Sequence, residues 1–129
     1  MSRAPKTILP GQCFQDPAQS GVTRSDIEWC LARLEKNPRS ITLPQTPTTE
    51  RPTSDRQDFF CYDDAPSGRH IKIRAVLNVT CPQKISSSQV IASVRRILNK
   101  CKSDGNMIGG TEYLDGNDQV FVDVYSNRL

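Results

Sequence analysis

The clearest pattern in the chain is an alternation of apolar and polar residues with a period of two, from His70 to Cys81. Successive side chains of a β-strand point to opposite faces, so this pattern predicts a strand with one buried face. The apolar side of that strand consists of Ile71, Ile73, Ala75, Leu77, Val79 and Cys81. A partner element must cover these side chains.

The apolar period becomes helical directly after this strand. Ser86 and Gln89 have the spacing of a capping box, and Ile85 and Val90 have that of a hydrophobic staple. One stripe at helical spacing contains Val90, Ile91, Val94, Ile97, Leu98 and Cys101. We therefore expect a helix over residues 86–100 that packs on the apolar face of the strand.

A second helical pattern lies nearer the N-terminus. Thr23 and Asp26 are placed as cap and capping partner, and a helix from about Arg24 to Lys36 would end before Asn37-Pro38, because a residue that precedes proline is pushed out of the helical region. Its apolar stripe contains Ile27, Cys30, Leu31 and Leu34.

Trp29, the one tryptophan of the chain, projects away from the apolar stripe of this first helix. Two interpretations are open. Trp29 is an exposed anchor for a partner, since tryptophan is frequent at binding hot spots, or a neighbouring loop covers it. We favour the loop at residues 44–57, whose proline- and threonine-rich composition is typical of a flexible connection.

Several shorter strands complete the predicted sheet. Their ranges are 7–9 or 12–14 as a broken edge strand, 40–43, 58–62 in a hairpin with the strand at His70, 107–114, and 119–125. Residues 115–118 form the turn before the last strand. Gly109-Gly110 precedes a strand rather than a helix, so we expect a bulge there and not a phosphate cradle.

The order of these elements predicts an α+β fold in one domain over residues 1–129. We expect a two-layer α/β sandwich of the ferredoxin-like, split βαβ type, with an antiparallel sheet and two helices on one face. A chain of 129 residues with 36% hydrophobic residues suffices for one modest core.

The charge and hydropathy exclude several partners. The formal net charge is +3, with acidic and basic residues interspersed, so we expect no nucleic-acid partner. No apolar run reaches the roughly 18 residues of a membrane span, and the first residues lack the apolar segment of a signal peptide. The protein is therefore either cytosolic or a secreted protein whose signal has been removed.

The five cysteines favour secretion. They are widely spaced, with no CxxC pair and a single histidine in the chain, so we predict disulfides rather than a metal site, with at least one thiol unpaired in the monomer. Cys81 and Cys101 cannot pair, since the helix between them is about 22 Å long and bonded cysteines need Cα atoms within about 7 Å. We predict a Cys13–Cys101 bond, and expect Cys30 to pair with Cys61 or Cys81. Reduced, buried cysteines in a cytosolic protein are the alternative.

Four features together resemble a known family. They are a strand rich in β-branched residues that runs into Thr80-Cys81-Pro82, a helix that ends at Cys101, the Gly109-Gly110 pair, and a terminal alternating strand. Over about residues 70–125 the chain resembles the small secreted effectors of plant-pathogenic fungi, particularly those with a killer-toxin-like α/β sandwich. This resemblance implies secretion, a role in virulence at or in a host plant, and no enzymatic activity.

We expect this protein to act by binding another protein. The sheet face opposite the helices would expose Arg74, Val76, Phe121 and Tyr125, which mix aromatic and basic groups as interfaces do, and Trp29 is the next candidate. A homodimer is the simplest partner, followed by a host protein or a second effector. A merely solvated face, or one covered by residues 44–57, is the alternative.

An enzyme is the second class of function. A small secreted hydrolase of the ribonuclease type would draw on His70, Lys72, Arg74, Glu112 and Asp123, but no second histidine exists to complete a ribonuclease pair. We therefore predict no catalytic, cofactor-binding or metal-binding residues. A cytosolic adaptor with a ferredoxin-like scaffold is the third class, and it would require reduced cysteines.

Asn78-Val79-Thr80 is an N-glycosylation sequon. We place Asn78 on the outward face of the strand, in the middle of the sheet, where it would be a poor acceptor.

Overall fold

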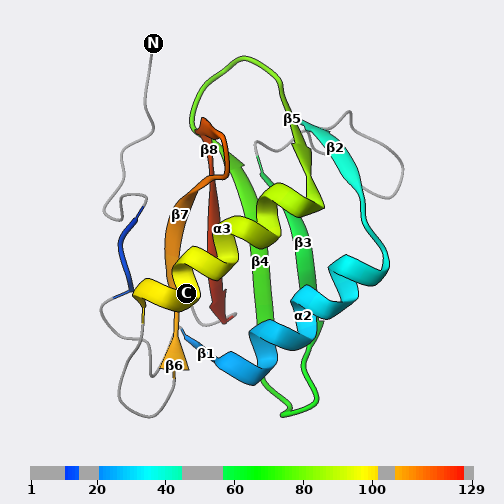
Figure 1. Ribbon diagram of the computed structural model, residues 1–129, viewed down its shortest axis with the longest axis vertical. Coiled ribbons are helices and arrows are strands. Elements are labelled where there is room, and N and C mark those ends of the chain that lie inside the picture. The colour runs from blue at the N-terminus through cyan, green and yellow to red at the C-terminus, as the bar shows by residue number, and fades with distance from the viewer. Residues whose placement is uncertain (1–10, 15–20, 45–56, 102–106, 127–129) are drawn as a thin grey trace.

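The computed structural model describes residues 11–14, 21–44, 57–101 and 107–126. Its elements, in chain order, are β1 (Val22–Thr23), α2 (Arg24–Lys36), β2 (Ser40–Leu43), β3 (Gln57–Asp64), β4 (His70–Leu77), β5 (Gln83–Ser86), α3 (Ser87–Lys100), β6 (Met107–Ile108), β7 (Gly110–Leu114) and β8 (Asn117–Ser126). Four strands form an antiparallel sheet in the order β3-β4-β8-β7, and both helices lie on one face of it (Figure 1). The predicted α+β class and the helix layer are confirmed.

Local capping explains where both helices begin. The backbone N–H of Asp26 donates to Thr23 Oγ1 at 3.2 Å, and Thr23 is extended, as an N-cap residue is. At α3 the capping box is complete, with Gln89 N donating to Ser86 Oγ and Ser86 N donating to the Gln89 side chain. The predicted bounds of α2 are confirmed, and those of α3 are confirmed with Ser86 as the cap.

The core lies between the helices and the sheet. In β4 the even alternation is confirmed, because its inward side chains are buried while its outward ones are partly exposed. The inward side chains of the two central strands are Ile71, Ile73, Ala75, Leu77, Val120, Val122 and Val124. Cys81 departs from the prediction. β4 ends at Leu77, so the alternation does not continue to Cys81, which is exposed.

The expected ferredoxin-like order is found in its second half. β4 and β7 are both antiparallel to β8, so they run in the same direction with β8 between them, and α3 connects them. This is a split βαβ unit. In the first half the predicted leading strand at 12–14 is reduced to one isolated bridge, Cys13 to Gly110, beside the outer edge of β7. The alternative at 7–9 lies outside the described residues.

The predicted β3–β4 hairpin is confirmed, and β3 is longer than expected. Residues 40–43 do form a strand, but β2 pairs with β5 in a separate two-stranded ladder. Most of the predicted 44–57 loop falls on 45–56, outside the described residues, and Gln57 already belongs to β3.

The bulge predicted at Gly109-Gly110 is wrong. The register shift of the β7–β8 hairpin lies between Tyr113 and Leu114 instead. At Gly109 the chain changes partners, because β6 pairs with β1 and β7 pairs with β8. A Cβ on Gly109 would lie 2.8 Å from the Phe14 ring, and one on Gly110 would lie 2.8 Å from Cys101 Sγ. The two glycines therefore permit residues 11–14 to lie directly against β7.

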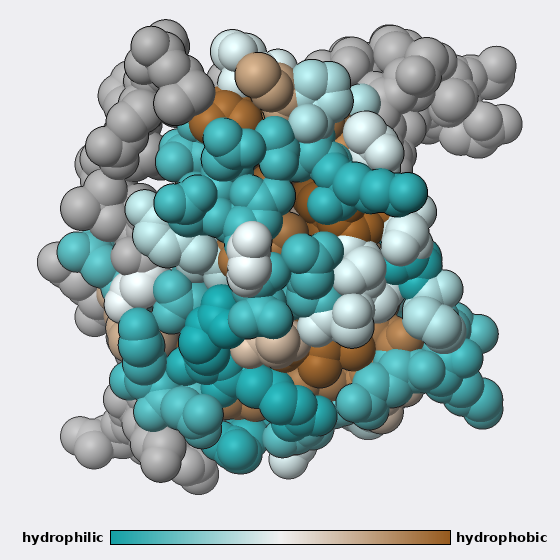
Figure 2. Space-filling model, turned by 45° about the horizontal axis from the view of Figure 1, so that its top comes forward, coloured by the Kyte–Doolittle hydropathy of each residue, from teal (hydrophilic) through white to brown (hydrophobic). Residues whose placement is uncertain are grey.

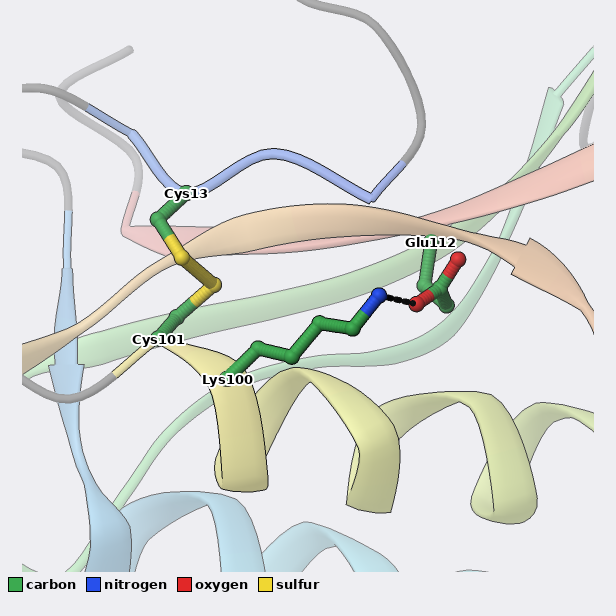
Figure 3. The surroundings of a disulfide bond; sticks show 4 residues. All are labelled: Cys13, Lys100, Cys101 and Glu112. Atoms are coloured by element: carbon green, nitrogen blue, oxygen red, sulfur yellow. Dashed lines mark hydrogen bonds and ion pairs between the residues drawn. A yellow bond between two sulfur atoms is a disulfide. The ribbon is translucent and has the colours of Figure 1, made fainter.

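Two disulfides connect the layers. Cys13 bonds to Cys101, and Cys30 of α2 bonds to Cys61 of β3, while Cys81 is free. The first pairing is confirmed, and Cys61 rather than Cys81 is the partner of Cys30. In Figure 3 the Cys13–Cys101 bond lies beside an ion pair between Lys100 and Glu112.

Two disulfides indicate an oxidising setting, which is typical of extracellular proteins. No helix within the described ranges has the length and apolar character to cross a membrane.

Candidate protein-binding face

The candidate site lies on the sheet face opposite the helices. Residues paired directly across neighbouring strands point to the same face, and Tyr62, Lys72 and Tyr125 are paired in this way across β3, β4 and β8. The next row on this face pairs Arg74 with Asp123. Aromatic rings and cations therefore occupy adjacent positions on three strands.

Cation–π contacts connect these rows. Lys72 Nζ lies 4.9 Å from the centre of the Tyr62 ring and 5.6 Å from that of Tyr125. The Arg74 guanidinium lies 5.0 Å from the Tyr125 ring. Such contacts are worth about 0.5–1 kcal/mol each at exposed sites. Ring-to-ring contacts of Tyr62 add two further residues to this group. We name the whole group the aromatic–cation cluster; its members are Phe59, Tyr62, His70, Lys72, Arg74 and Tyr125.

Tyr62 is the exposed centre of the cluster. Its ring meets Phe59 edge to face at 4.8 Å and His70 at 4.7 Å, yet 53% of the residue remains exposed. His70 Nδ1 is in turn 2.8 Å from Asp64 Oδ1. The flanking rings restrict the Tyr62 side chain while leaving its surface accessible to a partner.

The predicted exposure of Phe121 and Tyr125 is wrong. Phe121 is 3% exposed and Tyr125 is 5% exposed, while Arg74 and Val76 are partly exposed as expected. The ring of Phe14, far away in the sequence, packs edge-on against Tyr125 at 6.5 Å. Alternation along β8 predicts which way a side chain points, but a segment distant in the sequence decides whether that side is open.

Sequence reasoning missed Phe59 and Tyr62 as surface residues. The hairpin from β3 to β4 was the available signal, because it places Tyr62 opposite Lys72. The register shifts between Phe59 and Cys61, however, so Phe60 is an extra residue and is buried. Simple alternation would put Phe60, and not Phe59, on the face of Tyr62.

Trp29 lies elsewhere, on α2. It is partly buried against the core, and the Arg33 guanidinium covers its ring at 4.6 Å. It lines a hollow together with Thr23, Arg24, Ser25, Asp26, Pro66 and Ser67, none of which belongs to the aromatic–cation cluster. The predicted cover by the loop at residues 44–57 falls mostly on 45–56, outside the described ranges.

Of the five candidate catalytic groups, Glu112 is separated from the other four by the sheet. Glu112 faces the helix layer, where its carboxylate lies 3.0 Å from Lys100 Nζ and 3.9 Å from Arg96. His70 and Lys72 are on the opposite face of the sheet. General acid–base chemistry needs both groups within reach of one substrate, which this separation prevents for Glu112 and His70.

Arg74 and Asp123 form a nearly buried ion pair. Arg74 Nε and Nη2 each lie 2.8 Å from Asp123 Oδ2, and the Asp123 side chain is 5% exposed. Charge-assisted hydrogen bonds of this kind are stronger than neutral ones. The pair fixes the guanidinium that packs over Tyr125.

The pKa of Tyr125 is raised above its ordinary value of 10.0, mainly because burial disfavours the charged tyrosinate. Arg74 opposes this in part, whereas Asp123 adds to it. Between pH 10.0 and the folded-state pKa, the unfolded chain ionises first, so the free energy of unfolding falls as the pH rises.

We expect Tyr125→Phe to remove the part of the tyrosinate absorbance change that appears above the ordinary range of tyrosine. The same variant should lose less stability between neutral and strongly alkaline pH than the parent. Absorbance titration with parallel urea unfolding measures both. If Tyr125→Phe instead removed absorbance change within the ordinary pH range of tyrosine, the assigned burial of Tyr125 would be wrong.

Asn78 lies at a strand end rather than in the middle of the sheet. It follows Leu77, the last residue of β4, and its N–H donates to the Gln119 carbonyl. Asn78 is partly exposed and Thr80 is exposed, so the sequon is more accessible than a position in the middle of the sheet would be. Glycosylation of Asn78 stays a prediction.

Comparison with protein-family models, curated proteins and solved structures finds no match. In the described part of the chain, no group of three or more His, Cys, Asp or Glu residues could hold a metal ion.

Proposed function

We propose that this protein is secreted and acts, without enzymatic activity, by binding another protein through the aromatic–cation cluster. The setting is the one implied by the resemblance to fungal effectors, a host plant. The observation that carries the binding proposal is Tyr62, a half-exposed aromatic side chain supported by neighbouring rings on two sides.

A supported tyrosine is well suited to binding. Tyrosine and arginine are enriched among the residues that dominate interface energies. A side chain that is already restricted loses little conformational entropy when a partner covers it. Phe59 and His70 supply that restriction for Tyr62, while Lys72 supplies a positive charge beside it.

Other features support this choice over the alternatives. The separation of Glu112 from His70 argues against the hydrolase formed from the predicted residues, and the two disulfides argue against a cytosolic adaptor. The helix side, seen obliquely in Figure 2, is largely hydrophilic, with apolar patches visible between hydrophilic residues. Three kinds of partner fit the proposal: a second copy of the chain, a host protein or a second effector.

Replacing Tyr62 with serine tests the binding face. Loss of a hot-spot aromatic typically costs 2 kcal/mol or more, which corresponds to about thirtyfold weaker binding. Self-association is measured by sedimentation velocity, and heterologous partners by quantitative capture from host extracellular fluid. We expect Tyr62→Ser to reduce whichever association the parent shows, with an unchanged circular dichroism spectrum.

Tyr113 provides the matched control. It is also an exposed tyrosine, at 38%, and its pairing with Phe121 puts it on the same face, but on β7. Tyr113 is three strand spacings of about 4.8 Å away from Tyr62, and four residues of about 3.3 Å away along the strands, which places the two residues about 20 Å apart. Binding that survives Tyr62→Ser, or that Tyr113→Ser weakens equally, would refute this location of the site.

A further inference from the structure

Lys72 differs from the other basic side chains of the aromatic–cation cluster, Arg74 and His70, because it has no carboxylate partner among the described residues. Arg74 is paired with Asp123, and His70 with Asp64. Across the described ranges, Lys72 forms no ion pair with a carboxylate within 4.0 Å. Within the described part of the chain, its ammonium group contacts the rings of Tyr62 and Tyr125 instead.

The rings place this ammonium for an external partner. Tyr62 and Tyr125 flank Lys72 Nζ at 4.9 and 5.6 Å, and Lys72 is partly exposed in the middle of the face. Two ring faces can satisfy part of the charge but accept no strong hydrogen bond, so the ammonium can still donate its N–H groups to a partner. A negative group that approached here would meet a cation with reduced hydration, and would interact with it more strongly than in bulk water.

We propose that the partner presents a carboxylate to Lys72, within an acidic segment of protein that also covers Tyr62. This inference rests on the proposed function and names the chemistry of its partner. The pairing of charges on the face supports it, since Asp123 is paired with Arg74 and Asp64 with His70, whereas no described carboxylate lies within 4.0 Å of Lys72 Nζ. A carboxylate of the partner supplies the ion pair that Lys72 lacks within the described residues.

A nucleic acid fits the same face less well. Single-stranded nucleic acids need a continuous basic path for successive phosphates beside the stacking rings. On this face the described strands offer only Lys72 and Arg74 as permanent cations, and Arg74 is already paired with Asp123, so they form no such path. Asp64 also lies on this face of β3, opposite His70, and its carboxylate would repel a phosphate backbone. A single carboxylate can reach Lys72 without passing along β3.

The test compares Lys72→Met with Lys84→Met. Lys84 is a matched control, because it is an exposed strand lysine on β5 and takes part in no ion pair within the described residues. Both variants remove one positive charge and keep an unbranched side chain. The probes are a glutamate–tyrosine copolymer and, for comparison, oligothymidylate. Binding is followed by NMR shifts of the tyrosine rings and by titration at two salt concentrations.

We expect the copolymer to shift the ring signals of Tyr62 and Tyr125 in the parent. Lys72→Met should weaken this binding by about tenfold, while Lys84→Met stays close to the parent. If the two variants weakened binding equally, the net charge of the protein and not the position of Lys72 would control binding, and the proposal would be overturned. Tighter binding of oligothymidylate that depends on Lys72 would overturn it in favour of a nucleic acid.

The two proposals fail separately. If Tyr62→Ser abolishes binding of the natural partner and Lys72→Met leaves it unchanged, the face is correct and the acidic partner is wrong. If neither variant changes that binding, the proposed function itself fails at this face. The variant Lys72→Arg adds a check, since it keeps the charge and should retain most of the affinity.

Discussion

Replacing Cys13 and Cys101 together with serine is expected to lower the free energy of unfolding by about 4–5 kcal/mol, from the loop-closure entropy that this bond removes from the unfolded chain. The bond joins residues 88 positions apart, so it closes a long loop. It also holds residues 11–14 against β7, where Gly11 N donates to the Thr111 carbonyl and Phe14 N donates to the Gly109 carbonyl. Urea unfolding measures the change.

Two comparisons make this prediction specific. Cys81→Ser should alter stability by less than about 0.5 kcal/mol, because Cys81 is exposed and unbonded. Removal of the Cys30–Cys61 bond, whose cysteines are 31 positions apart, should cost about 3.7 kcal/mol in the same entropy calculation. A larger loss for the shorter loop would show that the enthalpy of the native contacts, and not chain entropy, controls these bonds.

Removing the guanidinium of Arg74 is expected to have the second large effect. Arg74→Met takes the cation away from a carboxylate that is 5% exposed, and breaking a buried pair from one side costs about 3–5 kcal/mol. The reason is that the nearly buried Asp123 carboxylate loses both contacts with the Arg74 guanidinium. Thermal and urea unfolding at neutral pH measure the loss.

Arg33→Met is the matched control for this pair. Arg33 and Asp63 are also 2.8 Å apart, but both side chains are about half exposed, so that pair should contribute less than about 1 kcal/mol. The double variant Arg74→Met, Asp123→Leu should recover most of the stability, because apolar residues often replace a buried ion pair at little cost. If Arg74→Met and Arg33→Met lowered the free energy of unfolding by equally small amounts, water would have to solvate Asp123 in the Arg74→Met variant, which would contradict the assigned burial of the pair.

Interactions between near neighbours in the chain were predictable. The bounds of α2 and α3 follow from caps and staples whose partners are three to five residues apart, and the apolar stripes follow from the helical period. The β3–β4 hairpin and the orientation of side chains in β4 follow from turn residues and a period of two. Such features depend on geometry within one or two turns of chain.

Pairings between distant segments were less predictable. The sequence allowed either Cys61 or Cys81 as the partner of Cys30. The choice of Cys61 depended on how α2 lies against β3. The strand before α2 was expected as a broken edge strand, and residues 11–14 have one isolated bridge at the edge of the sheet. The position of β8 between β4 and β7, however, was not predicted. Several strand orders bury the same apolar faces, so hydrophobic pattern alone does not choose among them.

The sequence by itself determined two amphipathic helices, an alternating central strand and the side of the sheet on which Arg74 and Tyr125 lie. Only the tertiary structure decided which side chains of that side are accessible: Tyr125 is covered beside Phe14, and Tyr62, shifted into place by an irregular register, is open. The physical reason is that direction along a strand is a local property of the backbone, whereas exposure is set by whatever distant segment packs above it.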